Sequence, residues 1–317
     1  MLRIYKTNCE TLRELTLAAC EKGAWLNLTA PDAAELTAVA ALTGAPGDAL
    51  RAALDEEERS RVEIEDNYIL VITNVAISRD GYGYDTLPLG IVLTRDYFVT
   101  VCLERHQVLE EFAAEGPRTF STAKKTRFLF QILYKSATLY LRYLKQINRR
   151  TDEIERDLRK SMKNQEIFQL LDMQKGLTFF TASLRSNGIV LEKLLRLRTS
   201  SNLQHLIAVY EEDEDLLEDV IIENKQAIEM VEIYSNVLSG MMDAFTSIIS
   251  NNLNIVMKFL AAVTILLAIP TMVTSFWGMN VADLPLTGSP HAFLYVLLLC
   301  SGAAGLAAFG LWRKGLL

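Results

Sequence analysis

The chain has 317 residues, is 50% hydrophobic and carries a formal net charge of −7. This acidic balance argues against nucleic-acid binding and is compatible with attraction of cations. Its four cysteines and three histidines are scattered without CxxC spacing, so neither a zinc site nor a disulfide framework is expected. No phosphate-binding loop, nucleophile elbow or pair of catalytic carboxylates occurs, and we therefore expect no enzyme.

The first 120 residues are predicted to form a cytosolic α+β domain. Pro31 is typical of a helix start, and Gly44 and Pro46 are typical of a helix end, which predicts a helix through Leu42. Period-two alternation and β-branched or aromatic residues predict a small sheet, with strands in 61–65, 68–75, 89–94 and 97–102. Because no apolar signal sequence opens the chain, we expect this domain to stay in the cytosol.

Residues 121–210 are predicted to form a cytosolic helical domain, and 211–258 the stalk part of one long helix. No proline occurs between Pro117 and Pro270. Helical periodicity dominates in three segments, 122–160, 164–197 and from 213 onward. If 213–277 is one helix, it is about 100 Å long at 1.5 Å per residue. A helix of that length entering a membrane is either a coiled stalk or the wall of a pore.

Two charge-free runs close the chain, at 259–277 and 292–312. Each has about 20 residues, enough to cross a hydrocarbon core of roughly 30 Å as a helix. They predict transmembrane helices at 259–277 and 291–312, an external loop at 278–290 and a basic tail at 313–317. A buried core hairpin is the alternative.

The charges beside these runs predict the orientation of the chain in the lipid bilayer. Lys258 precedes the first run, Arg313 and Lys314 follow the second, and the loop between the runs has no Lys or Arg. By the positive-inside rule, we expect a multi-pass protein of the cell (inner) membrane with both termini in the cytoplasm.

A stripe of small and polar residues follows the long helix at steps of three and four. Its members are Asp243, Ser247, Ser250, Asn254, Met257, Ala261, Thr264, Ala268, Thr271, Ser275 and Gly278. Close packing of membrane helices explains the small residues. It does not explain Asp243 and Asn254 on the same line, which favour a pore lining. Two spans cannot enclose a pore, so several copies must surround an axis. Pro270 is expected to kink or loosen the helix.

The first run ends on Gly278-Met279-Asn280. Glycine lets the chain turn as the helix ends, and the Asn280 carbonyl oxygen can accept hydrogen bonds from the water shell of a cation. At the mouth between two C-terminal spans, this tripeptide resembles the motif of the CorA-type magnesium transporters. Segments 61–66, 87–94 and 254–258 also resemble that family, so the resemblance covers essentially the whole chain.

The resemblance implies a funnel-shaped homopentamer whose five long helices line the pore, with Gly278, Met279 and Asn280 as the selectivity filter. It implies that Asn254 forms an inner polar ring, Met257 a hydrophobic constriction and Asp243 an acidic ring. It also implies that Mg²⁺ bound between cytosolic domains holds the channel closed, with Asp219 as one ligand. The partner of this carboxylate on the neighbouring domain is left open among Asp66, Asp80 and Asp85.

These observations predict a divalent-cation channel that takes up Mg²⁺ down its electrochemical gradient and is gated by cytosolic Mg²⁺. Asp283 is the only acid of the outer loop, where many relatives carry an acidic pair, and the choice among Mg²⁺, Co²⁺, Ni²⁺ and Zn²⁺ is left open. The alternatives are a zinc or cobalt/nickel transporter of the same family, or a membrane-tethered cytosolic binding protein. The acidic run at 211–215 either starts a helix or binds divalent cations.

Overall fold

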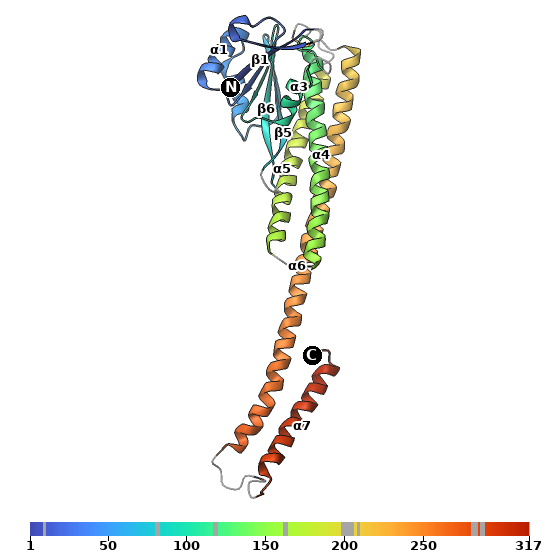
Figure 1. Ribbon diagram of the computed structural model, residues 1–317. Helices are drawn as coiled ribbons and strands as arrows, with labels where there is room; N and C mark the ends of the chain where they lie inside the picture. Colours follow the sequence, from blue (N-terminus) through green and yellow to red (C-terminus); the bar gives the residue numbers. More distant parts are fainter. Residues whose placement is uncertain are drawn as a thin grey trace. The chain divides into compact units, whose positions relative to one another are not determined.

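The computed structural model describes residues 1–8, 11–79, 83–116, 120–160, 164–197, 206–207, 210–279, 285 and 289–316 (Figure 1). The chain forms two compact units, Met1–Gly240 and Met241–Leu317. The boundary falls within the long helix α6 (Glu211–Trp277), which therefore contributes residues to both units.

A seven-stranded sheet organises the first unit, in the order β2-β1-β3-β7-β6-β5-β4. The strands are β1 (Leu2–Asn8), β2 (Thr11–Leu15), β3 (Trp25–Thr29), β4 (Arg61–Ile64), β5 (Tyr68–Ser78), β6 (Tyr84–Thr94) and β7 (Phe98–Cys102). Neighbouring strands are antiparallel except β3 and β7, which pair in parallel. The predicted strands correspond to β4 to β7, whereas β1, β2 and β3 were not predicted.

Both faces of the sheet are covered, which is why β7 is buried at every position. One face packs against the short helices α1 (Ala33–Thr43) and α2 (Gly47–Arg51). The predicted α1 boundaries are confirmed. The Asp32 side chain accepts a hydrogen bond from the Glu35 amide at 2.7 Å in a capping box, and Gly44 ends the helix at a φ of 72°.

The other face packs against α3 (Gln107–Glu115), α4 (Lys125–Lys160), α5 (Asn164–Leu197) and the start of α6 (Figure 1). Asn187 of α5 fixes this layer to the sheet. Its Oδ1 accepts hydrogen bonds from Ser60 Oγ, Thr73 Oγ1 and the Asn74 amide at 2.8, 3.0 and 2.9 Å, and its Nδ2 donates to the Asn74 carbonyl at 2.8 Å. The helical layer is therefore held by a buried amide as well as by apolar packing.

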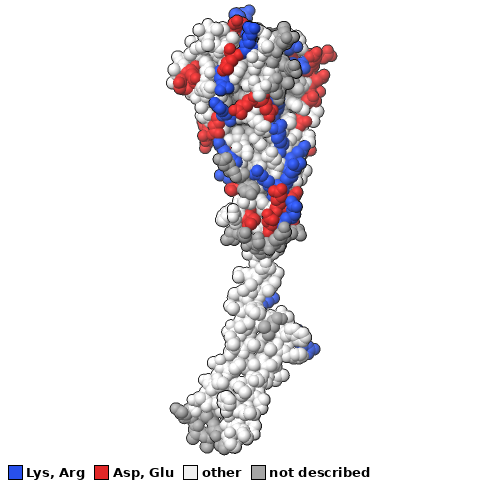
Figure 2. Space-filling view, in the orientation of Figure 1, with Lys and Arg blue, Asp and Glu red and all other residues white. Residues whose placement is uncertain are grey.

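The second unit contains the C-terminal part of α6 and helix α7 (Ala292–Arg313). Both helices are long and apolar enough to cross a membrane, and only 6% of each apolar window is buried. A core hairpin of a soluble protein would be mostly buried, so that alternative is wrong. Figure 2 shows charged side chains spread over the first unit and almost none on the second.

Candidate functional site

The predicted stripe lies on one exposed side of α6 within the second unit. Each member of the stripe from Asp243 to Gly278 is exposed in the single chain. Four of these residues, Thr264, Ala268, Thr271 and Ser275, line one shallow groove of about 480 Å³ together with Leu267 and Met272. The arrangement on one face is therefore as predicted, while the role of these residues as a pore lining stays a prediction.

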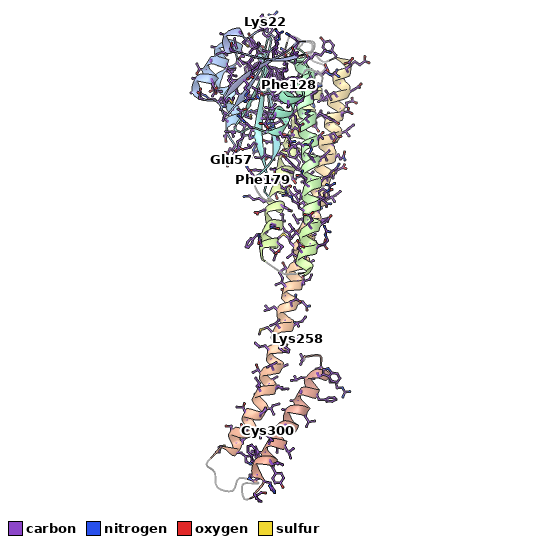
Figure 3. The ribbon with its side chains drawn as sticks, in the orientation of Figure 1. Lys22, Glu57, Phe128, Phe179, Lys258 and Cys300 are labelled. Carbon is purple, nitrogen blue, oxygen red and sulfur yellow. The ribbon has the colours of Figure 1, made fainter. Side chains whose placement is uncertain are left out.

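Helix α7 covers the opposite side of α6. The least exposed residues of the apolar part of α6 recur at helical spacing and form a seam, Ala262, Val263, Leu266, Ile269, Pro270, Val273 and Trp277. At 3.6 residues per turn, this seam lies on the other side of the helix from the stripe. Cys300 of α7 (Figure 3) is buried. Its Sγ donates to the Pro270 carbonyl at 3.9 Å. Packing within one chain therefore does not account for the stripe.

The two threonine hydroxyls of the stripe act as hydrogen-bond acceptors toward anything beside the helix. Thr264 Oγ1 donates to the Leu260 carbonyl at 2.8 Å, and Thr271 Oγ1 donates to the Leu267 carbonyl at 2.9 Å. A hydroxyl has one hydrogen, so each oxygen offers only lone pairs to anything beside the helix. Water molecules bound to a cation point their hydrogens outward. These oxygens therefore match the outer surface of a hydrated cation better than that of a hydrated anion.

The motif at the end of α6 is only partly described. The Gly278 amide continues the helical pattern by donating to the Thr274 carbonyl at 2.9 Å. As expected, α6 ends at Trp277 and Gly278 lies in a turn, but its φ is not in the left-handed region and its position leaves van der Waals room for a Cβ atom. Met279 is 51% exposed. Asn280 and Asp283 lie outside the described residues.

The predicted regulatory residues that the structure describes lie on different elements. Asp219 is exposed on α6, Asp66 is exposed beyond β4, and Asp85 accepts a hydrogen bond from the Thr86 amide at 2.8 Å. Asp80 lies outside the described residues. Among the residues that the structure describes, no group of three or more His, Cys, Asp or Glu side chains is placed to hold a metal ion.

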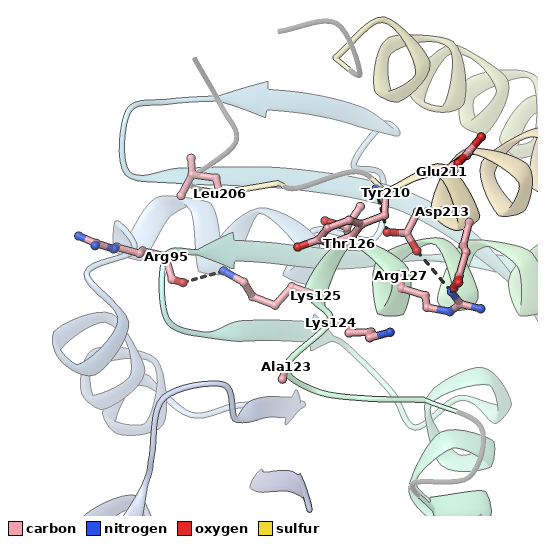
Figure 4. A pocket seen from close by; sticks show the side chains of 11 residues that line it. Arg95, Ala123, Lys124, Lys125, Thr126, Arg127, Leu206, Tyr210, Glu211 and Asp213 are labelled. Carbon is pink, nitrogen blue, oxygen red and sulfur yellow. Dashed lines mark hydrogen bonds and ion pairs between the residues drawn. The ribbon is translucent and has the colours of Figure 1, made fainter. Parts of the chain in front are cut away.

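Part of the acidic run at 211–215 has a structural role. Asp213 is 3% exposed, and its Oδ2 accepts a hydrogen bond from the Tyr210 amide at 3.2 Å, which caps the start of α6. Arg127 of α4 donates to Glu212 at 2.6 Å and lies 3.8 Å from Asp213 (Figure 4). These contacts support the helix-start interpretation for Glu212 and Asp213.

A pocket of about 750 Å³ lies beside this helix start, between α4, α6 and the turn that carries Arg95 (Figure 4). Lys125 is one of the residues that line it. Its Nζ donates to the carbonyls of Thr94 and Arg95, the second at 2.8 Å, and burial lowers the pKa of this ammonium group. These two hydrogen bonds tie the Lys125 ammonium group to the turn between β6 and β7.

The sequence analysis missed the exposed apolar side chains on the stalk part of α6. Within the first unit, Ile222, Ile233 and Val237 are 61%, 58% and 51% exposed. Large aliphatic side chains exposed on a helix indicate a surface that another protein surface covers. The sequence pattern that could have revealed them is that these aliphatic residues occur among the acidic residues of the helix, on the sides that face solvent.

Comparisons with known proteins agree with this architecture. A family model described as CorA-like Mg²⁺ transporter protein matches residues 21–313. The cobalt/magnesium transport protein CorA of Methanocaldococcus jannaschii is 27% identical over 279 residues, which cover 87% of this chain and 85% of that protein.

Two solved structures extend the comparison to the fold alone, because their identities are low. The complete CorA magnesium transporter of Methanocaldococcus jannaschii matches with a TM-score of 0.84 at 24% identity, over 100% of this chain and 99% of the other. The ZntB cytoplasmic domain of Vibrio parahaemolyticus matches with a TM-score of 0.59 at 13% identity, over 80% of this chain and 97% of that domain. The predicted α+β domain with a long helix and a C-terminal apolar helix is confirmed, and the chain is a member of the CorA-like Mg²⁺ transporter family.

Proposed function

We propose that this chain is a subunit of a divalent-cation channel that conducts Mg²⁺ along the stripe of α6. The observation that carries the proposal is the placement of the stripe: polar oxygens in an uncharged membrane segment, on the side that α7 leaves uncovered. A hydroxyl bonded to its own helix tolerates lipid, but its free lone pairs find hydrogen-bond donors only when it faces a water-filled axis. A shared aqueous conduit explains this arrangement, and a simple membrane tether does not.

Several chains are required to close such a conduit. One α6 presents a single wall, and the exposed Ile222, Ile233 and Val237 offer an apolar surface for a neighbouring chain. We take the number of chains as five, on the resemblance to the CorA family. In this assembly, Asp243, Asn254 and Met257 form successive rings at the cytosolic entrance, and Gly278, Met279 and Asn280 form the outer filter.

Neutral oxygens suit an ion that keeps its water shell. Mg²⁺ dehydrates reluctantly, so hydroxyl and amide acceptors can hold the hydrated ion without trapping it, as a ring of carboxylates would. The membrane potential contributes about 2.3 kcal/mol per charge per 100 mV, and a divalent cation is therefore driven inward without ATP. Co²⁺ is a second expected ion, and Ni²⁺ and Zn²⁺ are weaker candidates.

The orientation follows from the flanking charges. Lys258, Arg313 and Lys314 place both termini in the cytoplasm of a cell (inner) membrane, with 278–290 outside. The first unit is then exposed to cytosolic Mg²⁺. On the resemblance to the CorA family, we assign Asp219, which is exposed on α6, to an inhibitory Mg²⁺ site between neighbouring chains.

Flux of Mg²⁺ into proteoliposomes containing the full chain tests the pore. Thr271→Val removes one acceptor per chain at nearly constant volume, and we expect at least about a fivefold loss of flux, because even one lost acceptor costs on the order of 1 kcal/mol. Thr274→Val is the matched control. Thr274 also donates to an i−4 carbonyl, that of Pro270 at 3.0 Å, but lies outside the stripe. Equal losses in the two variants would refute the assignment of the stripe as the pore lining.

A second comparison addresses the alternatives. Wild-type protein that binds Mg²⁺ but passes none would support a membrane-tethered binding protein. Uptake of Zn²⁺ or Co²⁺ that Mg²⁺ does not compete with would support a transition-metal transporter. Asn280→Ala is expected to abolish the preference for Mg²⁺, and an unchanged preference would remove Asn280 from the filter.

A further inference from the structure

Three basic side chains belong to the second unit, Lys258 on α6 (Figure 3) and Arg313 and Lys314 at the end of α7. They are its only Lys or Arg residues, and all three are exposed in the single chain. The positive-inside rule explains why basic residues flank the two spans. It does not explain how these three are arranged around the helix pair.

The packing of the two helices brings the basic residues to one depth in the membrane. α7 runs back along α6 (Figure 1), and Cys300 of α7 contacts the Pro270 carbonyl of α6. Lys258 lies about 12 residues before Pro270, and Trp312 lies about 12 residues after Cys300, or about 18 Å in each helix at 1.5 Å per residue. Lys258 and the end of α7 therefore reach the same level.

Lys258 also lies on the side of α6 that faces α7. It precedes Ala262 by four residues and Leu266 by eight, and both of these belong to the seam of least exposed residues. Residues four apart share one face of a helix. A single headgroup at this level can therefore contact both α6 and α7.

The three charges are not balanced by the described part of the chain. Among the residues that the structure describes, none of the three side chains has a hydrogen bond or an ion pair. The described acid of the second unit, Asp243, lies about 22 Å from Lys258 along α6 at 1.5 Å per residue. Three neighbouring cations without a carboxylate attract an anion from outside the chain.

The basic residues of α7 are not needed to cap their own helix. Gly315 adopts a φ of 66°, and its amide donates to the Trp312 carbonyl at 2.9 Å. The Leu316 amide donates to the Leu311 carbonyl at 3.0 Å. This backbone motif satisfies the last carbonyls of the helix, so the Arg313 and Lys314 side chains stay available to a ligand.

The surface of α7 next to these cations fits an acyl chain. Leu306, Phe309 and Trp312 are 76%, 57% and 67% exposed, and the rings of Phe309 and Trp312 lie 6.2 Å apart. Leu306 and Phe309 precede Arg313 by seven and four residues, so the three share one face of the helix. A cation at the membrane boundary followed by an apolar face toward the bilayer centre has the order of an anionic phospholipid, headgroup first and chain second.

We propose that Lys258, Arg313 and Lys314 bind the phosphate-bearing headgroup of an anionic phospholipid in the cytoplasmic leaflet, with an acyl chain along Leu306 and Phe309. The inference rests on the proposed orientation of the two spans. A guanidinium group can hold a phosphate through two parallel hydrogen bonds, and each ammonium group adds a point charge. Because the headgroup contacts both helices, it fixes their separation at the cytoplasmic boundary.

Thermal unfolding of the full chain in a nonionic detergent tests this site. Dioleoyl phosphatidylglycerol is added stepwise in one series, dioleoyl phosphatidylcholine, which has the same chains but no net charge, in a second, and inorganic phosphate in a third. We expect a saturable rise in the Tm with phosphatidylglycerol alone, because a ligand that binds only the folded state stabilises it. An equal rise with phosphatidylcholine would show that any lipid fits, and a saturable rise with inorganic phosphate would show a site for a free anion. Either result, or no rise in any series, would overturn the proposal. No flux is measured, so the outcome is independent of whether the chain conducts Mg²⁺.

Variants separate this site from general attraction between charges. Lys258→Gln and Arg313→Gln are each expected to raise the half-saturating concentration of phosphatidylglycerol about fivefold, since each removes one basic group from the membrane boundary. Arg313→Lys keeps the charge and should stay within about twofold of the wild-type value. Lys225→Gln, which removes an exposed lysine from the first-unit part of α6, is the matched control and should leave the value unchanged. Equal weakening by Lys225→Gln, or wild-type values in both Lys258→Gln and Arg313→Gln, would refute the site.

Discussion

Acidification should destabilise the first unit through one residue, His106. Burial lowers the pKa of this imidazole from 6.5 to about 4 in the folded chain. Below pH 6.5 the unfolded chain binds a proton at His106, whereas the folded chain does not. The stability associated with the neutral ring is therefore complete above pH 6.5 and is lost as the pH falls toward 4. The cause of this shift is the loss of hydration around the buried ring, which disfavours the charged imidazolium.

The size of the effect follows from the two pKa values. The gap between 6.5 and about 4 corresponds to about 3 kcal/mol of unfolding free energy when titration is complete, at about 1.36 kcal/mol per pH unit. At pH 5 about 2 kcal/mol of this is lost. For a unit of this size, 1 kcal/mol moves the Tm by about 2–4 °C, so His106 alone should lower the Tm by about 4–8 °C between pH 7 and pH 5.

The assay compares wild-type protein with His106→Gln, whose side chain keeps a donor and an acceptor but does not titrate. The Tm of each full chain in detergent is measured at pH 7 and pH 5, in chloride buffers free of carboxylates and phosphate. The decrease in Tm from pH 7 to pH 5 is compared between the two proteins. The difference between the two decreases gives the contribution of the imidazole, because the many carboxylates that also titrate are the same in both. If both proteins lose the same number of degrees, His106 is not buried as a neutral ring and the reasoning is refuted.

Three further predictions concern packing and regulation. Asn187→Ala removes the acceptor shared by the Ser60 and Thr73 hydroxyls and the Asn74 amide, while the Asn74 carbonyl still accepts from Tyr140, and it should lower the free energy of unfolding by about 3–5 kcal/mol, measured by denaturant titration. Gly176→Ala places a Cβ 2.8 Å from that of Tyr84 and 3.1 Å from its carbonyl oxygen, and should cost about 1–3 kcal/mol in the same assay. Asp219→Ala should raise the internal Mg²⁺ concentration that halves flux at least several-fold, while Asp215→Ala, a neighbouring exposed acid, should leave it unchanged.

The central strands could be predicted from sequence because their own residues specify them. β5, β6 and β7 are runs of β-branched and aliphatic side chains, buried on both faces. The N-terminal hairpin gives no such signal. β2 is an edge strand with no fully buried residue, and its formation depends on pairing with β1. The parallel pairing of β3 with β7 joins segments about 70 residues apart, which no local pattern encodes.

In the candidate site, too, local patterns could be predicted from the sequence, whereas contacts between distant segments could not. Spacing along α6 was sufficient to place Thr264, Ala268, Thr271 and Ser275 on one side, because helical periodicity is a local property. The metal role of Glu212 and Asp213 could not be judged from sequence, since their contacts with Arg127 depend on how α4 and α6 pack. The burial of His106 was missed for the same reason: residues of three strands and a helix lie around it.

If the stripe lines the proposed pore, its hydroxyl geometry allows one lining to serve a wet and a dry state. When the conduit holds water, Thr264 and Thr271 offer acceptors to a hydrated cation. When it empties, their hydroxyl hydrogens remain bonded to the backbone of the preceding turn, so no donor is left unsatisfied in a dry site. Asp243 and Asn254 lack that option, and both precede Lys258, outside the uncharged run, where cytosolic water can reach them. The Asp243 and Asn254 side chains, which need constant hydration, thus lie at the entrance of the proposed pore. The threonine hydroxyls, which tolerate the loss of water, lie in the membrane segment, where a constriction can close by dewetting.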